Sequence, residues 1–232
     1  MKVIGVSGFA KAGKDTFVGI AIDILKSNGY CPFRVAFADK LKSEVQSMLI
    51  QYGFDLDLTK ISAAEKERIR PLFVFWGCQR RYDSPNGMYW INSIDAQLRK
   101  LCEDYIAREE SHENVVALVS DCRFPNEAKW IHDQCHGSII HIRKYKMEAY
   151  RDGLDGSEGE GAVYDPAPNA EEATQDPLVQ SVADVHVEWE DKNASTAVAA
   201  IEIPELKDIV LEALNKTTHF KLIRPITGRL IQ

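Results

Sequence analysis

The sequence predicts an α/β protein in which a parallel sheet is covered by helices, and three observations indicate this fold class. Short apolar runs alternate along the chain with stretches whose apolar residues recur at helical spacing. Residues 115–120 and 139–142 are almost continuously apolar, which is typical of strands that are buried on both faces. A glycine-containing loop joins the first strand to the first helix, as in a strand–helix–strand repeat.

Periodicity and turn residues place the individual elements. Asn28-Gly29 ends the first helix, and Ser62 with Glu65 three residues later forms a capping-box signature at the start of another. That helix is expected to reach about Trp76, with Pro71 kinking it or dividing it into two. The expected strands are residues 3–7, 33–37, 115–120, 139–142 and 185–189, and the expected helices are 14–27, 40–52, 62–76, 88–108, 126–134 and 205–214.

The stretch from residue 151 to residue 177 has a different character. Glycines and prolines stand among acidic residues, with almost no periodicity. This composition predicts a long loop or a flexible lid, and the acidic residues are expected to form its solvated face. They are Glu158, Glu160, Glu171 and Glu172.

Composition excludes several classes of partner. The formal net charge is -7 and the sequence pI is about 5.4, whereas binding to a nucleic-acid polymer relies on basic surfaces. No apolar run approaches the roughly 20 residues that span a bilayer. The five cysteines have no CxxC spacing and are expected to be reduced thiols. These features predict a soluble cytoplasmic protein that binds small molecules and neither nucleic-acid polymers nor membranes.

The first loop carries the clearest motif. Residues 8–14 satisfy GxxxxGK directly after a predicted strand and directly before a predicted helix, which is the context of a phosphate-binding P-loop. Its backbone N–H groups and Lys14 are expected to hold the phosphates of ATP. The position after the lysine is Asp15 and the hydroxyl follows as Thr16, so these two residues are expected to hold Mg²⁺, partly through water. The nucleotide-binding residues are therefore expected to be Gly8, Lys11, Ala12, Gly13, Lys14, Asp15 and Thr16.

Three separate motifs carry a resemblance to a known family. They are residues 13–16 (GKDT), residues 88–90 (Met-Tyr-Trp) and residues 120–128 (SDCRFPNEA). Together they resemble the deoxynucleoside monophosphate (dNMP) kinases of tailed bacteriophages, over roughly residues 1–145. The resemblance implies a nucleoside monophosphate (NMP) kinase-like P-loop fold, ATP and Mg²⁺ as cosubstrates, a dNMP acceptor, often a homodimer, and a place in the host bacterial cytoplasm. It also implies one kinase domain over residues 1–232, with a helical NMP-binding insertion at 38–112 and a lid at 145–182.

Asp121, Arg123 and Glu127 match the family pattern Asp-x-Arg-x-x-x-Glu at the end of a central strand, where a parallel sheet places its ligands. The resemblance implies that Asp121 binds the acceptor sugar or base, or a metal-bound water. Arg123 suits bidentate recognition of phosphate. Glu127 is expected to orient Arg123 or the nucleoside.

Further family positions fall on Arg70, Gly77 and Trp90, while Cys78 stands where the family usually has Thr. The resemblance implies that Arg70 contacts the acceptor phosphate, that Gly77 allows close approach of the backbone, and that Trp90 stacks on the base or walls it off. Periodicity alone favours a different role for Trp90, as a core aromatic on an amphipathic helix.

The family has a basic residue after an Ile-His pair at the end of a strand, and the resemblance implies that this residue stabilises the transferring phosphoryl group. This position falls on Lys144, with Arg143 beside it, and Arg151 is a further candidate. The expected catalytic residues are Lys14, Arg123, Arg143 and Lys144. The chain departs from the family at the lid, where Ser157-Glu158 lacks the usual histidine, and at residues 188–193, which replace an Asn-Asp-Gly near the adenine site.

Two alternatives remain open from the residues. A kinase of the same architecture whose acceptor is a hydroxyl, similar to dephospho-coenzyme A kinase, would need a base such as Asp15 or Asp121. A nucleotide-dependent regulator would bind one nucleotide and hydrolyse it slowly. The regulator would lack a second nucleotide site. The second set of candidate residues, in contrast, indicates that such a site is present. A guanine-specific Asn-Lys-x-Asp motif is absent from the sequence.

Overall fold

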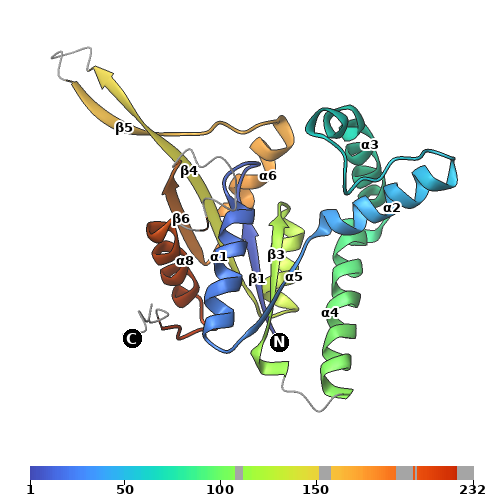
Figure 1. Ribbon diagram of the computed structural model, residues 1–232, viewed down its shortest axis with the longest axis horizontal. Coiled ribbons are helices and arrows are strands. Elements are labelled where there is room, and N and C mark those ends of the chain that lie inside the picture. Colours follow the sequence, from blue (N-terminus) through green and yellow to red (C-terminus); the bar gives the residue numbers. More distant parts are fainter. Residues whose placement is uncertain (108–111, 152–157, 192–200, 202, 224–232) are drawn as a thin grey trace, which may run out of the picture. The chain divides into compact units, whose positions relative to one another are not determined.

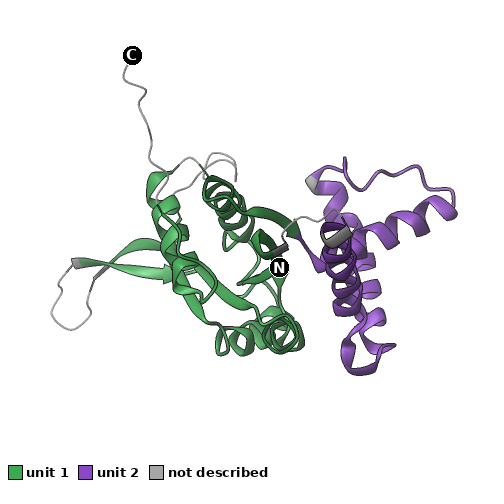
Figure 2. Cartoon of the chain, turned by 90° about the horizontal axis from the view of Figure 1, so that it is seen from below, with its two compact units in different colours: residues 1–34, 113–232 green, residues 35–112 purple. Residues whose placement is uncertain are grey.

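The computed structural model describes residues 1–107, 112–151, 158–191, 201 and 203–223. The chain separates into two compact units (Figure 2). Unit 1 consists of Met1–Arg34 and Glu113–Gln232 and contains the sheet, and unit 2 is Val35–His112. The insertion expected at residues 38–112 lies within unit 2. None of the helices in the described part of the chain combines the length and apolar character that a membrane crossing requires.

The sheet of unit 1 is mostly parallel (Figure 1). Its strands are β1 (Lys2–Ser7), β2 (Cys31–Val35), β3 (Val115–Cys122), β4 (Ser138–Arg151), β5 (Glu158–Tyr164) and β6 (Val185–Glu190). They follow the order β2-β3-β1-β4-β5, and β6 also pairs with β4. β1 is parallel to β3 and β4, β6 is parallel to β4, and β5 is antiparallel to β4. This sheet, with helices on it, confirms the predicted fold class.

Helices pack on both faces of this sheet because side chains alternate between the faces along each strand. Ile4 of β1 and Leu118 of β3 form one core with Phe17 of α1 (Lys14–Ser27) and Val210 of α8 (Pro204–Lys216). The helices α5 (Pro125–Asp133) and α6 (Ala170–Gln180) contact the sheet at β1. Between Ile4 and Val6, Gly5 turns to α5, where a Cβ would lie 2.6 Å from the Ile131 side chain. Glycine at this position therefore lets α5 approach the sheet closely.

The region expected as a long loop contains regular structure, so that expectation is wrong. β4 continues past residue 142 to Arg151 and pairs with β5, with the rings of Tyr145 and Tyr164 5.9 Å apart. α6 follows, and the Asn169 side chain caps it by accepting the N–H of Glu172 at 2.8 Å. Two glycines in β5 and Pro177 in α6 weaken the sequence signals for this strand and this helix. Pairing of β5 with β4 and the Asn169 cap of α6 nevertheless stabilise them. Residues 152–157, which include Ser157, and the side chain of Arg151 lie outside the described part, so the lid function remains a prediction.

Unit 2 contains α2 (Phe37–Gln51), α3 (Ala63–Tyr82), the 3-10 turn η1 (Pro85–Gly87) and α4 (Tyr89–Ala107), and a second 3-10 turn, η2 (His112–Asn114), begins at its last residue. The predicted capping box is confirmed, with the Ser62 hydroxyl accepting the Glu65 N–H at 3.2 Å and the Glu65 carboxylate accepting the Ser62 N–H at 2.8 Å. Of the two effects expected of Pro71, division of the helix is wrong, because α3 continues through the proline, past the expected end at Trp76, to Tyr82. Packing of α3 against α2 and α4 offsets the roughly 3 kcal/mol that an internal proline costs a helix.

A half-buried polar cluster joins the helices of unit 2. The Glu44 carboxylate of α2 accepts the Trp76 indole N–H at 2.9 Å and the Tyr89 hydroxyl at 2.6 Å. Arg80 lies 3.4 Å from the same carboxylate, with its guanidinium over the rings of both aromatics. Burial acts to raise the pKa of Glu44, but the two hydrogen bonds and the Arg80 charge outweigh it and hold that pKa below its ordinary value. One carboxylate thus joins all three helices.

Candidate active site

The loop between β1 and α1 has the backbone of an anion-binding nest. Gly8, Lys11 and Gly13 adopt positive φ angles of 130°, 68° and 94°. A Cβ on Gly8 would lie 2.3 Å from the backbone oxygen of Ile142, so no other residue fits there without a backbone shift. Turns of this kind present successive N–H groups to an anion, and the N-terminus of α1 adds positive potential.

Lys14 lies at the first position of α1 and turns back over the loop. Its side chain donates hydrogen bonds to the carbonyl oxygens of Gly8 at 2.6 Å and Phe9 at 2.7 Å. Burial, and after it the nearby charge of Arg123, lowers the pKa of Lys14 from 10.5 to about 8. The ammonium group therefore lies against the loop and loses its proton at a lower pH than an ordinary lysine does.

The last strand of the sheet, β6, contacts the phosphate-binding loop through a tryptophan side chain. The Trp189 indole of β6 donates a hydrogen bond to the carbonyl of Ala12 at 2.9 Å, and it is 3% exposed. A Cβ on Gly13 would lie 2.5 Å from the same ring, so the glycine lets the indole reach the loop. The sequence indicated that Trp189 ends the last strand and that residues 188–193 depart from the family, but it did not predict this contact with the loop.

Arg123 follows the end of β3, the strand next to β1. The Glu127 carboxylate is fully buried and accepts the backbone N–H of Arg123 at 2.8 Å and of Phe124 at 3.1 Å. Glu127 thereby satisfies N–H groups at the start of α5 and fixes the backbone from which the Arg123 side chain extends. Of the two roles expected for Glu127, the structure contains the contact with Arg123; the contact with a nucleoside remains a prediction.

Glu172 of α6 links Arg123 to the phosphate-binding loop. One carboxylate oxygen lies 2.7 Å from a guanidinium nitrogen of Arg123, and the other accepts the Ala10 N–H at 2.7 Å. The residue is 8% exposed. The expectation that Glu172 belongs to a solvated face is therefore wrong, because the N-terminus of α6 packs directly on the loop.

A hollow next to this contact contains charges of both signs. Gly8, Arg123, Phe124, Glu171, Glu172, Gln175 and Asp176 line it. Behind Asp176 lies His141 of β4, which is 1% exposed and 3.1 Å from the Asp176 carboxylate. Neither member of this pair was singled out from the sequence as a member of the site, since 35 residues separate them.

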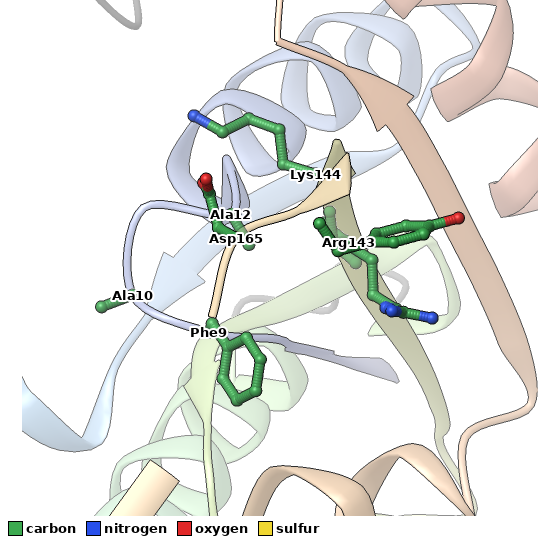
Figure 3. A pocket seen from close by; sticks show the side chains of 8 residues that line it. Phe9, Ala10, Ala12, Arg143, Lys144 and Asp165 are labelled. Atoms are coloured by element: carbon green, nitrogen blue, oxygen red, sulfur yellow. The ribbon is translucent and has the colours of Figure 1, made fainter. Parts of the chain in front are cut away.

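A second hollow borders the loop, and the two basic candidates of β4, Arg143 and Lys144, line it (Figure 3). Phe9, Ala10, Ala12, Ile142, Arg143, Lys144, Tyr164 and Asp165 line it. The Arg143 guanidinium stacks 3.8 Å from the centre of the Tyr164 ring, and Lys144 pairs with Asp191 at 3.0 Å. Figure 3 shows the side chains of Arg143 and Lys144 leaving the strand in opposite directions, as neighbours on a strand do. One phosphoryl group is therefore expected to contact only one of them.

The remaining acceptor candidates belong to unit 2, except Asp121, which is half-buried on β3. Arg70 is exposed on α3 and hydrogen-bonded to Glu67 at 2.8 Å. Trp90 is 3% exposed, and its indole donates to the carbonyl of Gly77 at 3.1 Å, which fits the role of a core aromatic. Cys78, which follows Gly77 on α3, is half-buried. The contacts of these residues with a monophosphate remain predictions.

Fold and site together define a P-loop α/β protein, with a phosphate-binding nest at the end of the first strand of a mostly parallel sheet. No family model matches the chain, and no curated protein matches it. Among solved structures, the chain is similar to shikimate kinase from Aquifex aeolicus, at 14% sequence identity and a TM-score of 0.36 over 93% of this chain and 95% of that one. A similarity this low carries no inference about function.

Proposed function

We propose that the protein is an ATP-dependent kinase that transfers the γ-phosphate of ATP to the phosphate of a deoxynucleoside monophosphate. The observation that carries this proposal is the position of Arg123. Its guanidinium shares the Glu172 carboxylate with the Ala10 N–H, so a loop donor and a cation from the adjacent strand converge on one point. A site that must bring two phosphates together needs this combination of groups.

Catalysis by these residues is mainly positioning and charge neutralisation. The loop N–H groups and Lys14 hold the donor phosphates, while Arg123 orients the acceptor phosphate toward them. A phosphate acceptor is already nucleophilic, so no general base is required. Asp15 and Thr16, the exposed and the buried residue after Lys14, would hold Mg²⁺, which supplies further neutralisation of phosphate charge.

The helical unit 2 would supply the remaining contacts to the acceptor. Arg70 has the charge for a phosphate contact, and the resemblance to phage dNMP kinases supports this role. The net charge of -7 favours a small-molecule acceptor over a nucleic-acid polymer. Homodimer formation and function in a bacterial cytoplasm are part of the same proposal and rest on the resemblance alone.

One observation favours a second candidate, a kinase whose acceptor is a hydroxyl group. Asp176 lines the same hollow as Arg123 and is backed by the buried His141. A carboxylate in this place has the position of a general base, which a hydroxyl acceptor needs and a phosphate acceptor does not.

The release of ADP with different acceptors distinguishes these candidates. The chain is incubated with ATP, Mg²⁺ and, in turn, each dNMP, each ribonucleoside monophosphate and dephospho-coenzyme A. Release with one or more dNMPs alone supports the proposal, and release with dephospho-coenzyme A alone favours the hydroxyl acceptor. If no acceptor stimulates release, the proposal fails and a nucleotide-binding regulator takes its place.

Two variants sharpen this assay. Arg123→Ala should raise the KM for the dNMP, because its phosphate loses the guanidinium. Asp176→Asn should leave the rate with a dNMP within about threefold of the unaltered chain, whereas loss of a general base lowers kcat by about 100-fold or more. A large fall in kcat with Asp176→Asn would contradict transfer to phosphate.

A further inference from the structure

We propose that Glu172 is a built-in competitor of the nucleotide, whose carboxylate must leave the Ala10 N–H and Arg123 before a phosphate can bind there. This inference rests on the nucleotide-binding part of the proposed function. It makes Glu172 a determinant of ATP affinity, although Glu172 itself contacts no reacting atom.

The contacts of Glu172 are those of an anion bound in a phosphate site. One oxygen of Glu172 accepts a long hydrogen bond of 3.5 Å from the Asn169 side-chain amide. The same oxygen accepts a hydrogen bond from Arg123, and the other accepts the Ala10 backbone N–H, each at 2.7 Å. Both distances are typical of charge-assisted hydrogen bonds, the kind that phosphate oxygens also form. Backbone N–H groups of such a loop otherwise serve phosphate.

The position of Glu172 leaves little room for a second anion at this point. Its side chain is 10% exposed, compared with 43% for its partner Arg123. The start of α6 holds the backbone of Glu172, because the Asn169 side chain accepts its N–H at 2.8 Å. A phosphate at the Ala10 N–H would therefore meet both the volume and the negative charge of this carboxylate.

An alternative role predicts the opposite effect on binding. If Glu172 merely positions Arg123 for phosphate, removal of its charge releases the guanidinium and weakens ATP binding. If Glu172 competes, the same change strengthens binding. The direction of the change thus separates the two roles.

The test replaces the carboxylate by an amide of the same shape, Glu172→Gln. The amide oxygen still accepts the Ala10 N–H, while the negative charge is lost. We expect ATP and inorganic tripolyphosphate to bind about tenfold more tightly to this variant by calorimetry, and adenosine to be unaffected. Without a nucleotide, the variant should unfold at a lower temperature, because Arg123 loses its charged partner. Glu205→Gln makes the same charge change at an exposed position in the first turn of α8. It should leave ATP binding unchanged and lower the unfolding temperature less than Glu172→Gln does, since only the interaction with the helix dipole is lost.

Equal or weaker binding of tripolyphosphate to Glu172→Gln overturns the inference. If the variant does not fold, a ¹³C titration of the unaltered chain replaces it, in which ATP should move the Glu172 carboxyl resonance toward that of a solvated glutamate; an unmoved resonance overturns the inference. The test is independent of the acceptor, so a chain that binds ATP but phosphorylates no dNMP contradicts the proposed function and leaves this comparison intact. A chain that binds neither ATP nor tripolyphosphate contradicts both.

Discussion

Raising the pH above neutral should weaken ATP binding through one proton on Lys14. Burial among the loop carbonyls, with Arg123 nearby, lowers the pKa of Lys14 from 10.5 to about 8. Phosphate oxygens beside the amine favour its charged form, so binding should raise this pKa again. Between the pKa of the free chain and that of the complex, binding takes up a proton, and the affinity must fall as the pH rises.

The magnitude follows from the pKa of the free chain. With a pKa of about 8, Lys14 is roughly one-tenth deprotonated near pH 7 and roughly nine-tenths deprotonated near pH 9. If only the charged amine binds well, ATP should bind about tenfold more weakly near pH 9 than near pH 7, which corresponds to about 1.4 kcal/mol.

Calorimetry in buffers of different ionisation enthalpy measures both the affinity and the protons taken up. We expect uptake of about 0.9 proton per ATP near pH 9 and about 0.1 near pH 7. Lys14→Arg is the matched control, because arginine keeps its charge throughout this range, and its weaker binding should not depend on pH. A flat profile for the unaltered chain, or an equal slope for Lys14→Arg, would refute the assignment of this proton to Lys14.

Other substitutions test the loop and the units separately. Lys14→Ala should fold, as judged by circular dichroism, yet lose nearly all ADP release; full activity would remove the P-loop assignment. Gly8→Ala should lower the free energy of unfolding in urea by about 1–3 kcal/mol, because its Cβ would collide with a β4 carbonyl. Gly77→Ala, in helix α3, should raise the free energy of unfolding by about 0.5–1 kcal/mol, because the added Cβ would make an ordinary van der Waals contact of 3.6 Å with the Leu41 side chain; a loss of stability would contradict this packing. Trp189→Phe should lower the free energy of unfolding by about 1 kcal/mol and weaken ATP binding, because the Ala12 carbonyl loses its hydrogen bond with the indole. Unchanged stability and affinity would show that this hydrogen bond is not needed.

The parts of the fold that the sequence could predict are those specified locally. Apolar periodicity placed α1 and β3 within about two residues, and the motif at residues 8–14 located the nest, because these patterns depend on neighbours in the chain. The Ser62 capping box could likewise be predicted, because its two partners, Ser62 and Glu65, are only three residues apart in the sequence.

What could not be predicted depends on long-range contacts. Glu172 reaches Ala10 across 162 residues, and nothing in its acidic surroundings distinguishes it from its exposed neighbour Glu171. β5 was missed because two glycines weaken its own strand preference, and only pairing with β4 provides its stability. The burial of Trp90, in contrast, could be predicted, because the helical periodicity of its surroundings already indicated the buried position that it occupies.

The hydrogen bond between Trp189 and Ala12 joins residues 177 positions apart, and this separation constrains when the nest can form. During synthesis, β1 and the loop leave the ribosome early, whereas β6 follows only after most of the chain has been made. Until β6 pairs with β4, Gly13 has no indole packed against it and Ala12 lacks its partner. Contacts of such high sequence separation form slowly, because the intervening loop must be closed first. A nascent or truncated chain that ends before residue 185 should therefore contain the complete P-loop motif and still fail to bind nucleotide.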